Sequence, residues 1–236
     1  MQGAGLRPRI RHRLRCHGTD RTDPRNDMLE LTPEECRVLG VLIEKGQTTP
    51  AQYPLSLNGI ANGCSQKSNR NPVVDYDEEA VMDTLDGLRS KNLCVLVDMA
   101  SSRVLKYKHN ARETLAVATG ELVLLAELML RGPQTIGELR TRASRMHPIE
   151  SLQVAESHLG NLMERTEPLV RRLPPAPGSR AERFAQLLCP DLHPLDAAPA
   201  PSPTAAPAAS PDLEARVERL ETEVAELRRM IEAMRG

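Results

Sequence analysis

The stretches ECRVLGVLIEKGQTT, residues 35–49, and ELVLLAELMLRGPQT, residues 121–135, align with each other without a gap. Leu39 in the first stretch coincides with Leu125 in the second, and apolar residues recur in both every three or four positions. This spacing predicts an amphipathic helix in each stretch. The same helical segment therefore occurs twice in the chain.

Two further pairs of segments repeat in the same order. VMDTLDGL at 81–88 matches AESHLGNL at 155–162, and SRVLKY at 102–107 matches SRAERF at 179–184. Three matched blocks in one order predict an internal duplication. We therefore expect two copies of one fold in tandem.

The first copy contains clear signals for three helices. Thr32 suits an N-cap, and Glu35 completes a capping box, so a helix is predicted from this point to Gly46. A second helix is predicted over about 55–65 from its apolar spacing. A third is predicted to start near 75–77, where acidic residues favour the positive end of the helix dipole.

The segments CVLVDM and RVLKYKH follow the third helix and are joined by ASS. They predict a β-hairpin. Three helices followed by a hairpin is the order of a winged helix, a helix-turn-helix with a β wing. In the second copy Thr135 opens another capping box with Glu138, and the wing tip is expected at PPAPGSR.

The predicted fold class is mainly α with small β wings (α+β). Two tandem winged-helix domains are expected over 28–112 and 118–189, and a semi-rigid Pro/Ala linker over 190–211. Residues 212–236 are predicted to form a coiled coil.

The predicted coiled coil rests on a heptad pattern. Its a positions are mostly β-branched and its d positions mostly Leu, a combination that favours a parallel homodimer. A single amphipathic helix exposed to solvent is the alternative. The dimerisation residues are Leu213, Val217, Leu220, Val224, Leu227, Ile231 and Met234.

The Arg-rich segment 1–27 carries seven Arg and three Asp and shows no helical or strand period. Three interpretations remain open. Translation starts at Met28, or the segment is a disordered tail, or it is a transit peptide.

Composition limits the function. The formal net charge is −1, so no overall field favours nucleic acid or membrane. With no Trp, one Phe and three Tyr, base-stacking platforms are not expected. No apolar run approaches the length of a membrane span. These features predict a cytoplasmic protein that does not act at a membrane.

Cysteine and histidine show no metal-ligand spacing, and no catalytic or phosphate-binding motif is present. We therefore predict no enzyme activity, no cofactor and no metal. The cysteines are dispersed, which fits a reducing compartment, and Cys64 is expected on the buried face of the second helix. They are Cys16, Cys36, Cys64, Cys94 and Cys189.

The stretch TTPAQYPLSLNGIANGCSQKSNRNPV at 48–73, followed by an acidic third helix, closely resembles the hallmark of the YceH-like family. LRGPQTIGELRTRA at 130–143 matches in the second copy. The resemblance covers about residues 30–189. It implies a bacterial cytosolic protein with two tandem winged-helix domains, and it implies no established activity.

Binding of double-stranded DNA is the usual role of a winged helix. The third helix of the first copy, however, presents Glu79 and Asp83 outward, and these carboxylates would face phosphate charge. The second copy is therefore the better candidate. The predicted contacts are Lys67, Ser68, Asn69, Arg70, Arg103, Lys106, Lys108, Arg140, Arg142, Arg145, Ser157, Asn161, Arg171, Arg172, Arg180 and Arg183.

The alternative is a protein-interaction scaffold, because acidic tandem winged helices resemble the accessory subunits of chromosome-condensing complexes. The sequence slightly favours a DNA-associated, regulator-like dimer over this scaffold. It names no operator, effector or partner.

The polar stretch CSQKSNRNP, residues 64–72, has two interpretations. Lys67 and Arg70 contact phosphates, or Arg70 and the neighbouring asparagines pin the acidic helix by pairing with residues 75–79. The acidic residues 75–79 themselves suggest either a cation site or, as we favour, simple complementation of the helix dipole.

Overall fold

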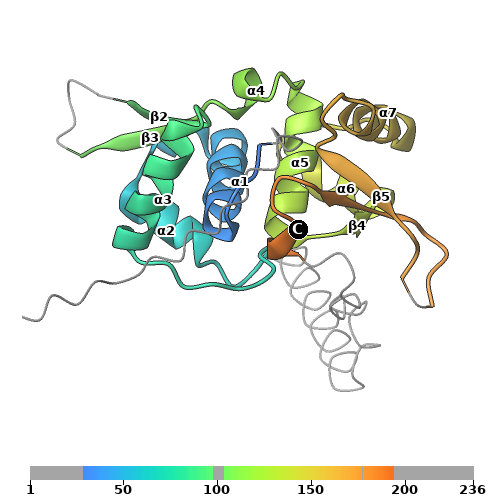
Figure 1. Cartoon of the computed structure of the whole chain (residues 1–236), viewed down its shortest axis with the longest axis horizontal. Coiled ribbons are helices and arrows are strands. Elements are labelled where there is room, and N and C mark those ends of the chain that lie inside the picture. Colours follow the sequence, from blue (N-terminus) through green and yellow to red (C-terminus); the bar gives the residue numbers. More distant parts are fainter. Residues whose placement is uncertain (1–28, 98–103, 177, 194–236) are drawn as a thin grey trace, which may run out of the picture.

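The computed structural model describes residues 29–97, 104–176 and 178–193. Segment 1–27, the coiled coil and most of the Pro/Ala linker therefore lie outside the described residues, and the predictions made for them stay predictions. The described part is a mixed α and β structure with two small antiparallel sheets, consistent with the predicted α+β class (Figure 1).

The first half contains α1 (Pro33–Thr48), the 3₁₀ turn η1 (Pro50–Gln52), α2 (Leu57–Cys64) and α3 (Glu78–Ser90). Its strands are β1 (Leu55–Ser56), β2 (Cys94–Val97) and β3 (Lys106–His109), which form an antiparallel sheet in the order β1-β3-β2. The predicted three helices and hairpin are thus present.

The second half repeats this order. It contains α5 (Thr119–Arg131), α6 (Ile136–Ala143) and α7 (Leu152–Met163). Strands β4 (Gln134–Thr135), β5 (Val170–Leu173) and β6 (Arg183–Gln186) pair in the order β4-β6-β5. A short helix, α4 (Ala111–Thr114), connects the halves, and η2 (Pro190–Leu192) follows the second sheet.

Helix starts agree with the predicted capping signals. The Thr32 hydroxyl accepts a hydrogen bond from the Glu35 N–H at 3.1 Å, and the Glu35 carboxylate accepts one from the Thr32 N–H at 2.8 Å. Thr135 and Glu138 form the same box at the start of α6. Asp77 caps α3 through the Ala80 N–H at 2.8 Å. These side chains satisfy backbone donors that have no partner inside the helix.

Two predicted boundaries are wrong. Helix α1 continues through Gly46 to Thr48, and the first two residues predicted for the second helix, Leu55 and Ser56, form strand β1 instead. A Cβ at position 46 would lie 3.3 Å from the Tyr53 ring, so this glycine permits a close contact rather than ending the helix. The aligned Gly132 has φ +82° and does end α5.

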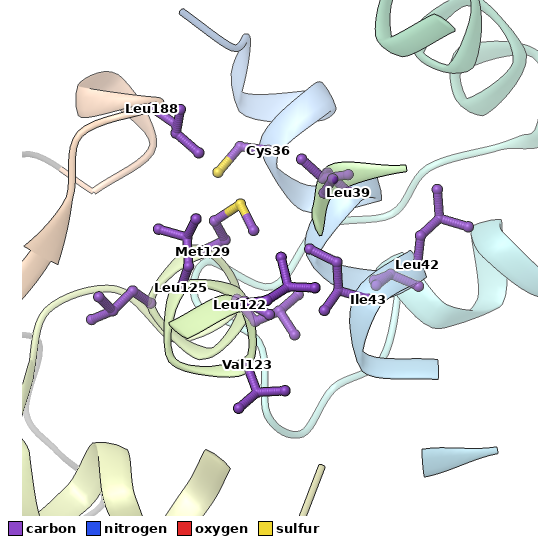
Figure 2. Packing of buried hydrophobic residues seen from close by; sticks show 14 of the residues in the cluster. Cys36, Leu39, Leu42, Ile43, Leu122, Val123, Leu125, Met129 and Leu188 are labelled. Carbon is purple, nitrogen blue, oxygen red and sulfur yellow. The ribbon is translucent and has the colours of Figure 1, made fainter. Parts of the chain in front are cut away.

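One continuous apolar core joins the two halves. Figure 2 shows its centre, where α1 and α5 pack side by side, with Ile43 beside Leu122 and Cys36 beside Met129. The repeated helices that open each copy are thus each other's packing surface. Their burial fixes α3 with its hairpin at one end of the molecule, and α7 with its hairpin at the other (Figure 1).

Candidate interaction surface

The loop at 64–72 is a structural link, not an exposed basic site. Burial of the Arg70 side chain is complete, and its guanidinium lies 2.5 Å from the Glu44 carboxylate of α1. Its Nε donates to the Gly63 carbonyl at 3.0 Å. Arg70 is therefore not available to a phosphate, and the prediction that it pairs with residues 75–79 is wrong.

Glu44 is the centre of a buried ion-pair network. Besides Arg70 it contacts Arg145, which follows the end of α6, at 2.6 Å, and Arg145 also lies 3.2 Å from Glu127 of α5. Glu127 contacts Arg131 of the same helix at 2.6 Å. Burial alone would raise the pKa of Glu44, but the bonds and charges of the two arginines outweigh it and hold this pKa below its ordinary value.

The same loop also reaches α5 with its asparagines. The Asn69 side chain accepts a hydrogen bond from the Arg131 guanidinium. The Asn71 N–H donates to the Leu130 carbonyl at 2.8 Å, and the Asn71 carbonyl lies 2.5 Å from Nε2 of buried His193. These bonds join the first half to the second. Of the predicted contacts in this loop, Lys67 and Ser68 are exposed without such ties.

The predicted arginines of α6 are also engaged within the protein. Arg140 donates to the carbonyls of Ile149 and Glu150, both at 3.2 Å. Arg142 lies 2.5 Å from the Gln134 side-chain oxygen and 3.3 Å from Glu138. With Arg145 held by the ion-pair network, these cations position the loop after α6 and the start of β4.

On α7 the predicted base-contacting residues differ in their surroundings. Ser157 is exposed. The Asn161 amide donates to the Glu121 carboxylate at 2.8 Å, and this carboxylate also accepts the Ala118 N–H that begins α5. Asn161 is therefore tied to the first turn of α5.

The hairpins carry the remaining predicted cations. In the first, Lys108 is exposed and Lys106 half-buried, while Arg103 lies outside the described residues. In the second, Arg172 contacts Glu182 at 3.0 Å and lies over the Phe184 ring, and Arg183 is half-buried.

Arg171 and Arg180 of the second hairpin are exposed. Within the described parts of the chain no acidic side chain pairs with either of them. They are therefore the predicted contacts that remain best placed for an external anion.

A surface that the sequence reasoning did not identify lies on α3 and the first hairpin. Met82 is 45% exposed, Leu96 of β2 is 39% exposed, and Leu105, immediately before β3, is 55% exposed. Glu79 and Asp83 are exposed on the same helix as Met82. Strand alternation could not have found Leu96, because it places Leu96 on the same face of the hairpin as buried Cys94.

The four cysteines in the described ranges are all buried. Cys64 and Cys94 are buried, and burial raises the pKa of each thiol to about 12. Thiolates would therefore be scarce at neutral pH. Among the described residues no group of His, Cys, Asp and Glu is arranged to hold a metal ion. Nor does any helix there have the length and apolar character to cross a bilayer.

Comparison with known proteins gives a consistent family match. Residues 31–179 match the family described as "Protein of unknown function, DUF480". A UPF0502 protein of Pelobacter propionicus is 49% identical over 213 residues, covering 87% of this chain and 97% of that protein. A UPF0502 protein of Shewanella pealeana is 44% identical over 213 residues, covering 87% and 99%. One from Geotalea daltonii is 54% identical over 157 residues, covering 66% and 72%. These matches are consistent with the YceH-like resemblance of residues 48–73.

Proposed function

Since the chain belongs to the DUF480 family of proteins of unknown function, we propose its role from its own geometry: it is a non-enzymatic scaffold that binds a protein partner. It would act in the bacterial cytoplasm. The binding surface would lie on α3, at one end of the molecule (Figure 1).

We interpret each half as a winged-helix domain, with boundaries at 28–112 and 118–189. In this interpretation α3 and α7 are the third helices, and the β2–β3 and β5–β6 hairpins are the wings. The third helix is the part of such a domain that enters a DNA groove, so its side chains discriminate between DNA and other partners.

The observation that carries the proposal is the charge of α3. Four exposed carboxylates lie along it, on Glu78, Glu79, Asp83 and Asp86. Its one arginine, Arg89, is bonded to Asp86 at 2.8 Å. Phosphate contacts supply most of the affinity for DNA, and an acidic helix in a groove would repel those phosphates. A protein surface of opposite charge has no such penalty.

DNA association is the second candidate, and one observation favours it. Arg171 and Arg180 stand exposed on the second hairpin, where a wing contacts the DNA backbone. Ser157 on α7 is also exposed toward solvent. In this version the second domain would bind duplex DNA while the first remains free.

A parallel homodimer through residues 212–236 belongs to both candidates. It is supported by the heptad pattern of that segment, since dimeric operator binders and scaffolds both use such pairing. Sedimentation of the full chain with Leu220→Pro and Leu227→Pro would test it. The dimer predicts a fall to monomer mass, and an unchanged mass would contradict the coiled coil.

The test of function is a titration of the full chain against mixed-sequence duplex DNA at about 50 and about 200 mM salt. The scaffold proposal predicts no specific or salt-sensitive binding at either concentration. Binding that weakens steeply with salt, and weakens further after Arg171→Ala with Arg180→Ala, would replace it by the DNA candidate. Lys67→Ala serves as the matched control, because Lys67 is an exposed cation on the other half of the molecule.

A further inference from the structure

We propose that α3 and the first hairpin dock a basic amphipathic helix of a protein partner. This inference rests on the proposed scaffold function and names the kind of partner it takes. The docking face is formed by Glu79, Met82, Asp83, Asp86, Leu96 and Leu105.

The helical part of the docking face is a single stripe. Glu79, Met82, Asp83 and Asp86 follow one another at spacings of three, one and three residues, so they share one side of α3. All four are exposed. The opposite side of the helix carries buried residues such as Leu85. The stripe therefore faces away from the packed side of α3, and within it Asp86 is paired with Arg89.

The hairpin part lies beside this stripe. Leu96 is directly opposite Tyr107 in the β2–β3 register, so the two side chains project from the same face of the sheet. Tyr107 is buried and β2 contacts α3, so this face of the hairpin lies toward α3. Figure 1 shows the hairpin extending beyond the body of the molecule at that end.

The two faces of the hairpin differ in character. Lys106 and Lys108 pair with Val97 and Val95 and project from the face opposite Leu96. These two cations, predicted to contact DNA, thus lie on the face of the hairpin opposite Leu96.

Charge complementarity selects the occupant. Apolar side chains on the docking face favour an apolar stripe on the partner, and its carboxylates favour Lys or Arg at the edges of that stripe. A helix laid in an apolar groove presents such a pattern at positions i, i+3, i+4 and i+7. A basic amphipathic helix satisfies both requirements, whereas duplex DNA would meet repulsion from the carboxylates.

The second half of the same chain provides an internal comparison. Leu85 aligns with Leu159, so Glu79, Met82 and Asp83 correspond to Gln153, Glu156 and Ser157. The apolar and doubly acidic stripe of α3 is absent from this place on α7. The duplicated fold therefore presents the docking face only once among the described residues, and the equivalent stripe on α7 is a control for non-specific attraction.

The experiment uses a fluorescein-labelled peptide of about 18 residues, or five helical turns, built from leucine and lysine with leucine at helical spacing. A second peptide has glutamate in place of every lysine. Fluorescence anisotropy with the full chain should show saturable binding of the lysine peptide and none of the glutamate peptide. Glu79→Lys with Asp83→Lys should weaken binding by about tenfold or more.

Matched variants distinguish specific binding at the docking face from non-specific attraction to acidic side chains. Met82→Asp should also weaken binding, although it adds a negative charge, because the apolar contact is lost. Glu156→Lys on α7 removes one acid from the equivalent position of the other domain and should leave the affinity unchanged. All sites are exposed, so circular dichroism should show native helix content in each variant.

Several results would overturn the proposal. These are no binding of the lysine peptide, equal weakening by the α7 variant, or a gain of affinity with Met82→Asp. If the α3 variants change the sedimentation mass, the occupant is a second copy of this chain and the partner-helix proposal is wrong. A negative peptide result with no DNA binding leaves the scaffold standing without this surface, so the two proposals fail separately.

Discussion

The Arg70 guanidinium lies 2.5 Å from the Glu44 carboxylate, and both side chains are excluded from solvent. Arg70 belongs to the loop before α3 and Glu44 belongs to α1. Glu44 also forms an ion pair with Arg145 in the second half of the chain. A single carboxylate therefore connects the loop that precedes the docking face to the turn that follows α6 in the second half of the chain.

Removal of one partner of this pair should be costly. Arg70→Ala leaves the Glu44 charge buried with one cation fewer, and we expect a loss of about 3–5 kcal/mol of unfolding free energy. Urea unfolding followed by circular dichroism measures this. Arg171→Ala, at an exposed arginine, is the control and should leave the unfolding midpoint in place. A similar midpoint for both variants would mean that the network is not stabilising.

The depressed pKa of Glu44 sets the direction in which its contribution to the free energy of unfolding changes with pH. Because its folded-state pKa is depressed, its charged form stabilises the fold above the ordinary glutamate pKa of about 4.3. That contribution is lost as the pH falls through the lower, folded-state value. The difference in urea midpoint between wild type and Glu44→Gln should therefore be largest near neutral pH and shrink in acid. A difference that grows in acid would contradict the assignment.

The shared core predicts that the two halves unfold together. Leu39 of α1 and Leu125 of α5 are fully buried in the core that both halves share, so truncation of either to alanine should cost about 2–5 kcal/mol. Each change should move one single transition, observed equally by near- and far-ultraviolet circular dichroism. Two separate transitions, with only one displaced by each substitution, would show that the domains are independent.

Thiol labelling tests the burial of Cys64 and Cys94, two of the three buried cysteines in the first half of the described chain. Cys64 and Cys94 are buried with pKa values raised to about 12, so both should resist a thiol reagent at pH 8. Mass spectrometry of peptides should find them modified only after unfolding. Rapid modification of either in the native protein would mean that the first half of the chain opens locally.

Local signals in the sequence predicted much of the fold. The Thr32 and Thr135 capping boxes, both hairpins, and the burial of Cys64 depend on residues within a few positions of each other, and all are confirmed. Strands β1 and β4 were missed because two residues carry no alternation pattern. Gly46 was misjudged because its close contact, Tyr53, approaches from outside the helix.

The candidate site was harder to predict because its decisive contacts are not local. In the sequence, Glu44 lies in a segment that resembles an exposed helix end. Its side chain is buried because Arg70 and the second half of the chain cover it. Most of the arginines proposed for DNA are engaged by carbonyls or carboxylates that the fold brings to them. Conversely, Leu96 and Leu105 resembled ordinary strand residues, and only their exposure identifies them as a surface.

The most direct test is one pair of substitutions, Glu79→Lys with Asp83→Lys, measured against both ligands. The account predicts that wild type binds the basic leucine peptide and no duplex DNA at about 50 mM salt, and that the variant loses the peptide and gains affinity for DNA. Wild-type binding to duplex DNA, with peptide affinity unaltered by the two lysines, would contradict the claim that α3 is a protein-docking helix.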